Sequence, residues 1–124
     1  MRIFKSTWFT RFAGKEGITD GELIEMVTKL EAGQADVDLG GGVYKIRVAR
    51  SGEGKSGGYR VIVFFRNEQR TFYQYAFPKS SRGNINKGEL QFYKKMAKTN
   101  FAMSDRELAD AIKAGEYIEI EESV

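Results

Sequence analysis

The chain contains no cysteine and no histidine. Without cysteine it has no disulfide framework and no thiolate chemistry, which fits a reducing compartment. Without histidine it lacks the usual general base, the usual neutral-pH switch and the commonest metal ligand. Any catalysis would therefore depend on lysine, arginine, tyrosine, carboxylates or the substrate itself. We accordingly expect neither a bound metal nor another cofactor.

Long apolar runs are missing as well. No stretch of the sequence approaches the roughly 20 apolar residues that a membrane-spanning helix needs. The opening residues 1–5 lack the apolar core of a signal peptide. We therefore expect a cytoplasmic protein with no membrane attachment. A length of 124 residues suits one domain, 1–124, and one Trp, six Tyr and nine Phe argue against disorder.

Positive charge is concentrated in the middle third of the chain. Residues 43–82 hold nine Lys or Arg against two acidic residues, a local balance of +7, whereas the rest holds eleven basic and fifteen acidic residues, a balance of −4. The basic residues of this window are Lys45, Arg47, Arg50, Lys55, Arg60, Arg66, Arg70, Lys79 and Arg82. A basic region within strand-forming, aromatic sequence is typical of proteins that bind phosphates.

The apolar periodicity predicts an α+β fold with a mainly antiparallel sheet. A short strand is predicted at residues 2–5, followed by two helices that we expect to pack as an N-terminal helical hairpin. Three strands should then form an antiparallel meander, and C-terminal helices and a last short strand should follow. Three capping boxes predict helix starts, and they are Thr19 with Glu22, Asn86 with Glu89, and Ser104 with Glu107.

Lys45 and Arg47 lie two residues apart on the first strand of the meander, where basic and apolar residues alternate. Two cations on one strand face must meet either solvent or an anion. A neighbouring antiparallel strand can bring Arg60 beside them, and Lys79 and Arg82, just after the third strand, can complete the same patch. We predict that this patch binds phosphate, with a merely solvated face as the alternative.

The glycine-rich segment 52–58 superficially resembles a nucleotide-binding loop. A P-loop needs a glycine five residues before Gly54, where this chain has Ala49, and it needs a helix afterwards, where we predict a strand. We therefore exclude ATP or GTP binding at this segment. A hairpin loop that presents Lys55, with Arg50 at its base, to a polyanion is the better interpretation.

Tyr75 lies on the third strand of the meander, on the same face as Tyr73 and Phe77. Aromatic rings on a sheet can stack on unpaired bases. They can equally belong to the hydrophobic core, because large rings bury much apolar area. We keep Tyr75 as a candidate RNA-binding residue and expect Trp8 to be a core residue.

With these residues identified, the chain resembles the RelE/HigB superfamily of toxins from type II toxin-antitoxin modules, and most closely its HigB-like branch. The resemblance covers most of the chain and includes the strand 44–48, the Gly58-Tyr59-Arg60 opening of the next strand, and the segment from Phe77-Pro78-Lys79 to Arg82-Gly83-Asn84-Ile85. It implies a compact RelE-like fold and endonucleolytic cleavage of messenger RNA on the ribosome. It also implies neutralisation by a cognate antitoxin, for which we expect a helix-turn-helix protein, and a monomer when the antitoxin is absent.

The resemblance also implies roles for single residues. Lys45 and Arg47 match two basic residues of a family strand, and Arg60 matches the arginine that contacts the scissile phosphate. Lys79 matches a basic residue after the last strand of the meander, and Arg82 approximates the arginines found there. Two positions depart from the RelE pattern: Ser80 replaces an arginine, and Asn86 stands where RelE has a tyrosine.

The implied reaction is attack of the RNA 2'-hydroxyl on the adjacent phosphate without a metal ion. Lys45, Arg47 and Arg60 would stabilise the phosphorane, and Lys45, next to Arg47, is the candidate general base. Two alternatives remain open. The chain could be a non-catalytic module that binds RNA or DNA, or an inactive toxin homologue whose basic surface receives an antitoxin.

Overall fold

The computed structural model describes residues 1–50, 54–78 and 84–121, together with their side chains except those of residues 50 and 54–57. Six strands and four helices lie in these ranges. They are, in chain order, β1 (Arg2–Ser6), α1 (Thr7–Glu16), α2 (Asp20–Glu31), β2 (Val37–Gly40), β3 (Val43–Arg50), β4 (Gly54–Phe65), β5 (Arg70–Pro78), α3 (Lys87–Ala102), α4 (Asp105–Lys113) and β6 (Tyr117–Ile120). The expected α+β class is confirmed.

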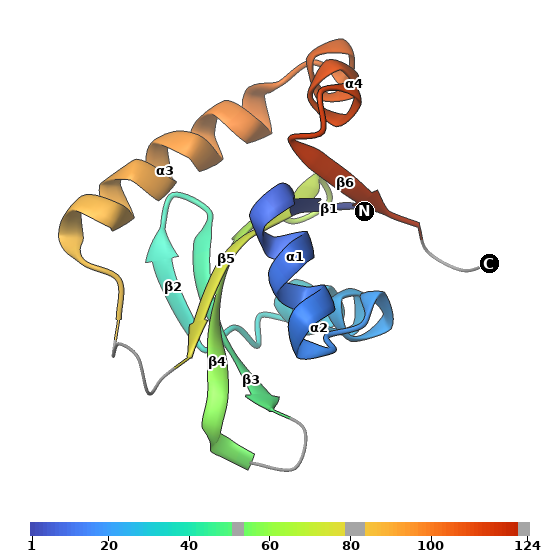
Figure 1. Ribbon diagram of the computed structural model, residues 1–124. Helices are drawn as coiled ribbons and strands as arrows, with labels where there is room; N and C mark the ends of the chain where they lie inside the picture. The colour runs from blue at the N-terminus through green and yellow to red at the C-terminus, as the bar shows by residue number, and fades with distance from the viewer. Residues whose placement is uncertain (51–53, 79–83, 122–124) are drawn as a thin grey trace.

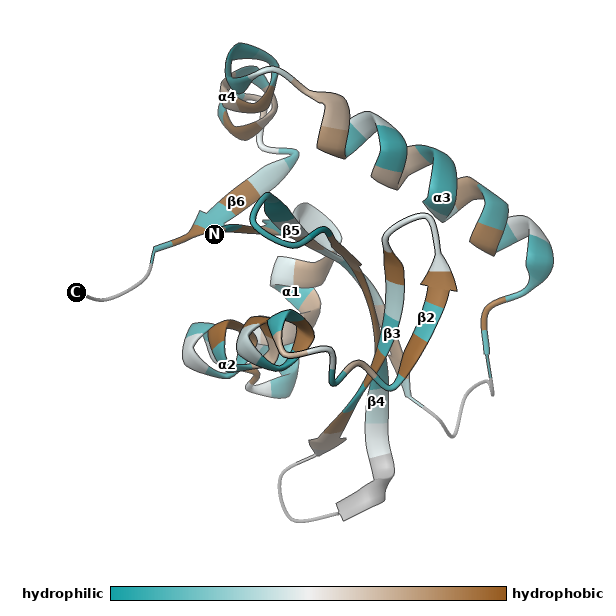
Figure 2. Ribbon diagram, turned by 180° about the vertical axis from the view of Figure 1, so that it is seen from behind, coloured by the Kyte–Doolittle hydropathy of each residue, from teal (hydrophilic) through white to brown (hydrophobic). Residues whose placement is uncertain are grey.

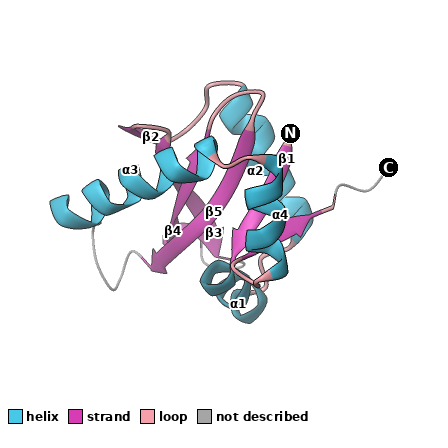
Figure 3. Ribbon diagram, turned by 90° about the horizontal axis from the view of Figure 1, so that it is seen from above, coloured by secondary structure: helices cyan, strands magenta, loops and turns pink. Residues whose placement is uncertain are grey.

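The strands form one mostly antiparallel sheet in the order β2-β3-β4-β5-β1-β6. The meander β3-β4-β5 is antiparallel throughout, as the sequence predicts. The N-terminal strand β1 lies between β5 and β6 and runs parallel to β5. The first strand, β1, and the last, β6, therefore lie side by side at the sheet edge opposite β2, as Figures 1 and 3 show.

The helix starts are set by local side-chain hydrogen bonds. The Ser6 hydroxyl accepts the amide N–H of Phe9 at 3.0 Å and so caps α1, whose C-cap is Gly17. All three predicted capping boxes are confirmed at the starts of α2, α3 and α4. None of these helices is long and apolar enough to cross a membrane, within the ranges that the structure describes.

The expected helical hairpin at the N-terminus is not matched, because the chain begins with β1 and both following helices turn their apolar sides to the sheet. Phe9 of α1 and Leu23 of α2 are fully buried in one core cluster. The same cluster contains Val61 and Tyr73 from the sheet. The sheet thus provides the apolar partner that we had expected the helices to give each other.

The two faces of the sheet carry separate cores. The first, against α1 and α2, is the cluster just described. The second lies against α3 and α4, where Phe64 and Phe72 of the sheet pack with Ala97 and Leu108 of the helices. Alternating teal and brown bands along α3 in Figure 2 reflect this amphipathic packing. Side chains of the meander that the structure describes therefore pack either against α1 and α2 or on the face that α3 covers.

Candidate functional site

Three predicted cations share one face of the sheet. Arg47 on β3 lies directly opposite Arg60 on β4, and Lys45 lies opposite Ile62 in the same ladder. Directly paired residues of antiparallel strands project to the same face. Ile62 belongs to the core against α3, so this face is the α3 face. We call Lys45, Arg47 and Arg60 the cation cluster.

The apolar residues that alternate with these cations point the other way. Tyr44, Ile46 and Val48 pack into the core against α1 and α2. The predicted alternation of β3 is thereby confirmed. It matters because one buried apolar face fixes the register of the strand, and a shift by one residue would turn the cations into the core.

Arg60 is the most unusual member of the cation cluster, since its side chain is only 6% exposed. Its Nη1 atom is shielded from solvent and has no hydrogen-bond partner among the described residues. A buried donor without a partner costs about 1–3 kcal/mol, and more when it is charged. Arg47 adds a second positive charge directly across the ladder, which is also unfavourable. An anion bound between the two guanidinium groups would relieve both costs.

Lys45 is held by the segment that precedes α3. Its ammonium group donates a hydrogen bond to the side-chain oxygen of Asn84 at 3.2 Å. The same oxygen accepts the amide N–H of Ile85 at 2.9 Å, which orients the Asn84 amide. Asn84 thus positions Lys45 from outside the sheet, a role that sequence reasoning missed although it quoted Asn84 in the family resemblance.

Arg70, another basic residue of the middle third, has structural partners. Arg70 donates to the carbonyl oxygens of Asn100 at 3.2 Å and Met103 at 2.7 Å, and it pairs with Asp105 at 3.2 Å. It therefore caps the end of α3. Ion pairs within the described ranges are Arg2–Glu119, Lys5–Asp20 and Arg70–Asp105, and none of them involves the cation cluster.

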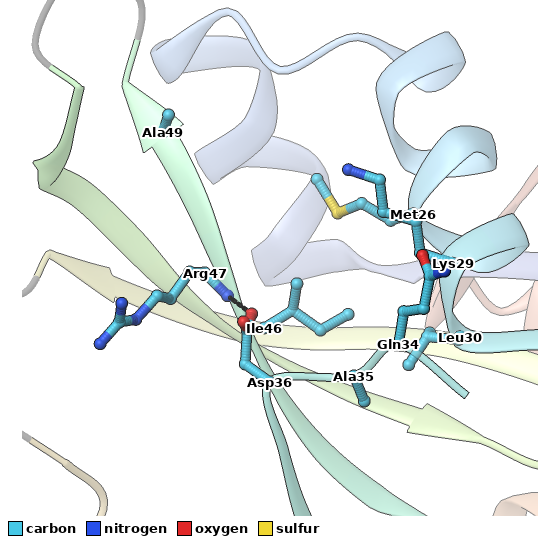
Figure 4. Close-up of a pocket in the computed structure, with 9 residues that line it drawn as sticks. All are labelled: Met26, Lys29, Leu30, Gln34, Ala35, Asp36, Ile46, Arg47 and Ala49. Carbon is cyan, nitrogen blue, oxygen red and sulfur yellow. Dashed lines mark hydrogen bonds between the residues drawn. The ribbon is translucent and has the colours of Figure 1, made fainter. Parts of the chain in front are cut away.

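A hollow of about 310 Å³ lies on the opposite side of β3, between that strand and α2. Figure 4 shows Ile46 and Met26 at this hollow, while the guanidinium of Arg47 extends away from it. The backbone N–H of Arg47 donates to the Asp36 carboxylate at 2.6 Å. Arg47 therefore borders the hollow, while its guanidinium, which belongs to the cation cluster, extends away from it.

The remaining predicted site residues have different outcomes. Lys79 and Arg82 lie outside the described residues, as do the side chains of Arg50 and Lys55. Tyr75 is half-buried on the α3 face, opposite Ile62, and Phe77 shares this face. The prediction that Tyr73 lies on the same face is wrong, because the register of β4 against β5 shifts between Ile62 and Val63 and turns Tyr73 into the core against α1 and α2. Whether any of the predicted site residues binds RNA stays a prediction.

The expectation that Trp8 belongs to the core is wrong. Its side chain is 44% exposed, and its ring lies 4.5 Å from that of Tyr75. The reason is that β1 pairs with β5 only as far as Tyr73. Beyond that point the edge of β5 is bordered by the start of α1 instead of by a strand. Trp8 therefore sits at an edge, where helical spacing alone had suggested an interior position.

Comparison with known families gives the chain its identity. Residues 1–120 match the family model described as the RelE toxin of the RelE / RelB toxin-antitoxin system. The match extends over every described strand and helix and includes the whole cation cluster. The chain therefore belongs to the RelE family of toxins, which act in toxin-antitoxin systems.

Proposed function

We propose that this toxin is a metal-independent endoribonuclease that cleaves messenger RNA at the cation cluster. The observation that carries the proposal is the arrangement of Arg60, which is buried, charged, and opposite Arg47 on the same face. Its Nη1 has no partner in the part of the chain that the structure describes. A scissile phosphate satisfies such a group better than solvent does, because a guanidinium matches phosphate oxygens with paired donors.

The reaction that fits these residues is an in-line attack. The RNA 2'-oxygen forms a bond to the adjacent phosphorus while the bond from phosphorus to the 5'-oxygen breaks. The 2'-hydroxyl proton passes to a base, for which we propose Lys45, and a proton reaches the departing 5'-oxygen. The products are a 2',3'-cyclic phosphate and a free 5'-hydroxyl. Arg47 and Arg60 would stabilise the extra negative charge of the phosphorane between these states.

Lys79 and Arg82 remain proposed members of the same site, and Arg50 and Lys55 remain proposed contacts to the RNA backbone. We further propose that the substrate is messenger RNA on the translating ribosome, as for the HigB-like branch. A cognate helix-turn-helix antitoxin would hold the protein inactive, and the toxin alone would be a monomer.

The test compares Arg60→Ala with a matched control, Arg66→Ala. Arg66 is exposed just after β4, and its guanidinium stacks on the Phe101 ring at 4.5 Å. Each variant is induced in cells, growth is followed, and RNA ends are mapped for a 2',3'-cyclic phosphate. We expect Arg60→Ala to lower cleavage by a few hundredfold, since loss of one such donor typically costs about 3 kcal/mol in the transition state. Arg66→Ala should cleave as the wild type does.

Each outcome has a clear meaning. A folded Arg60→Ala chain that still arrests growth removes Arg60 from the mechanism. Wild-type protein that binds RNA but produces no cyclic phosphate ends on any transcript is a binding module or an inactive homologue. Cleavage of purified RNA at the same rate as translated RNA would contradict the dependence on the ribosome.

A further inference from the structure

A row of aromatic rings crosses the molecule from α1 over β5 to α3. The ring of Trp8 lies 4.5 Å from that of Tyr75, tilted by 41°. Tyr75 lies 6.5 Å from Tyr93 in a stacked arrangement, and Tyr93 lies 5.9 Å from Phe92. Trp8 is 44% exposed and Phe92 is 59% exposed, whereas large apolar side chains are mostly buried. The row is therefore open to solvent at both ends.

Trp8 is held firmly in this open position. Its ring stacks on Phe12 at 5.4 Å with an interplanar angle of only 11°, and Phe12 in turn packs edge-on against Tyr59 at 5.0 Å. The Ser6 hydroxyl, at the start of the same helix, donates to the carbonyl oxygen of Gln74 at 2.9 Å. These contacts attach the beginning of α1 to the edge of β5 and fix the indole, so its exposure does not result from a loose helix end.

Tyr75, the member of the row on β5, lies on the same face as the cation cluster. Tyr75 is paired with Ile62, which is paired with Lys45, and Phe77 is paired with Arg60. Neighbouring strands are about 4.8 Å apart, so the aromatic rings of β5 stand one strand away from Arg60. The part of this face on β3 and β4 is therefore cationic, and the adjacent part on β5 is aromatic.

We infer that Trp8 and Tyr75 form a stacking platform for an unpaired base of the RNA whose backbone the cation cluster binds. This inference rests on the proposed function and adds a base-binding site to it. Proteins that bind single strands combine cations for the phosphates with aromatic rings for the bases. Stacking tolerates different bases, because each base has a flat π-surface. The platform would thus hold the strand in position for cleavage without selecting a sequence through hydrogen bonds.

The fluorescence of Trp8 shows whether a base is stacked on its ring, because Trp8 is the only tryptophan in the chain. The probe is a single-stranded 2'-O-methyl hexanucleotide, which the proposed reaction cannot cleave. It is compared with the same oligonucleotide carrying abasic sites at its two central positions. We expect the intact probe to quench the Trp8 fluorescence and the abasic probe to leave it nearly unchanged, although both carry the same phosphate charge.

Variants then separate stacking from charge. Binding of a labelled probe is followed by fluorescence anisotropy for Trp8→Leu, for the ring-retaining Trp8→Phe, and for Ile118→Ala as the control. Ile118 is exposed to a similar degree, 43%, but it lies on β6, paired with Lys5 and on the same side as Ile120, so it is on the face of the sheet opposite to the cation cluster. Trp8→Leu should bind the intact probe roughly tenfold more weakly and the abasic probe equally well. Trp8→Phe should recover most of the loss, and Ile118→Ala should bind as the wild type does.

The experiments distinguish failure of the proposed stacking platform from failure of the proposed nuclease activity. If the wild-type protein generates cyclic phosphate ends but the intact probe neither quenches Trp8 nor loses affinity in Trp8→Leu, the platform is overturned and the nuclease stands. If the probe quenches Trp8 but no transcript is cleaved, the platform stands as part of a binding surface. A Trp8→Leu toxin that binds and cleaves normally but escapes its antitoxin would assign this ring to a protein contact and overturn the inference.

Discussion

Gly58 on β4 lies against the backbone of Val48 on β3, so that a Cβ atom on Gly58 would come 2.1 Å from the Val48 carbonyl oxygen. No real Cβ atom approaches an oxygen that closely, and the neighbour is backbone, which cannot rotate away. The register of β3 against β4 also shifts between Val48 and Arg50. Gly58 therefore permits the close approach of two strands just before Arg60 takes its place opposite Arg47.

Gly58→Ala should therefore lower both stability and activity. We expect a loss of about 1–3 kcal/mol in the free energy of unfolding, as for other overpacked sites, measured by urea denaturation. Gly14→Ala is the matched control, because Gly14 lies within α1 and a Cβ there meets nothing within 4 Å. That variant should gain up to about 1 kcal/mol from helix propensity. Equal stability of Gly58→Ala and the wild type would contradict the close approach.

Arg60→Met should lower RNA cleavage by about the same few hundredfold as Arg60→Ala, without lowering stability. Methionine fills a similar volume and has no donor to satisfy, and replacing a poorly paired buried charge by an apolar side chain is often neutral or stabilising. We expect the free energy of unfolding to stay the same or to rise by about 1 kcal/mol. A fall of several kcal/mol would mean that Arg60 is structural, and its proposed role at the phosphate would lose its main support.

For Arg70→Met, at a second arginine of the same basic segment, we expect the opposite result: lower stability and unchanged cleavage. Arg70 satisfies two carbonyl oxygens at the end of α3 and pairs with Asp105. Its removal should lower the free energy of unfolding by about 2 kcal/mol, since hydrogen bonds from charged donors contribute about 1.5–3 kcal/mol. Cleavage per folded molecule should be unchanged. Urea denaturation and the RNA assay, run on both variants together, separate the two roles.

The ion pair between Arg2 and Glu119 predicts a pH dependence of stability. Hydrogen bonds from the Arg2 guanidinium, at 2.9 Å to each carboxylate oxygen, hold the pKa of Glu119 below its usual value. A carboxyl group whose pKa is lower in the folded protein stabilises the fold above its unfolded pKa, and this contribution is lost as the pH falls through the folded pKa. The pair is exposed, so the effect should stay below about 1 kcal/mol.

Glu119→Gln should thus be slightly less stable than the wild type near neutral pH and equally stable in strong acid. Urea midpoints at the two pH values measure the difference, and Glu121→Gln, just beyond β6, serves as the control. A stability gap that persisted unchanged in acid would show that Glu119 acts by packing and not by charge.

The parts of the fold that sequence could predict are those with local causes. The pair Thr19 and Glu22 predicts a helix start because both members of a capping box lie within one turn. Lys45 and Arg47 share a face because side chains alternate along any strand. These rules need only a few consecutive residues, and the structure confirms the helix starts, the meander and the common face of the cations.

The parts that sequence reasoning missed depend on distant residues. The pairing of Ile3 with Ile120 leaves no trace in any local pattern, so the position of β1 could not be predicted. The four-residue strand β2 was overlooked because it runs directly into glycines, and it exists only through its pairing with β3. The burial of Arg60 and the exposure of Trp8 likewise depend on which neighbours the sheet supplies.

The position of β1 also affects the order in which the molecule can be completed during synthesis. β1 leaves the ribosome before the other strands, but its pairing is complete only after β6 has been synthesised, because β6 is one of its two neighbours in the sheet. The strands that carry the cation cluster all lie within residues 43–78, far from the end of the chain. A nascent polypeptide can therefore contain the strands of the cation cluster while its sheet is still unfinished on the opposite side.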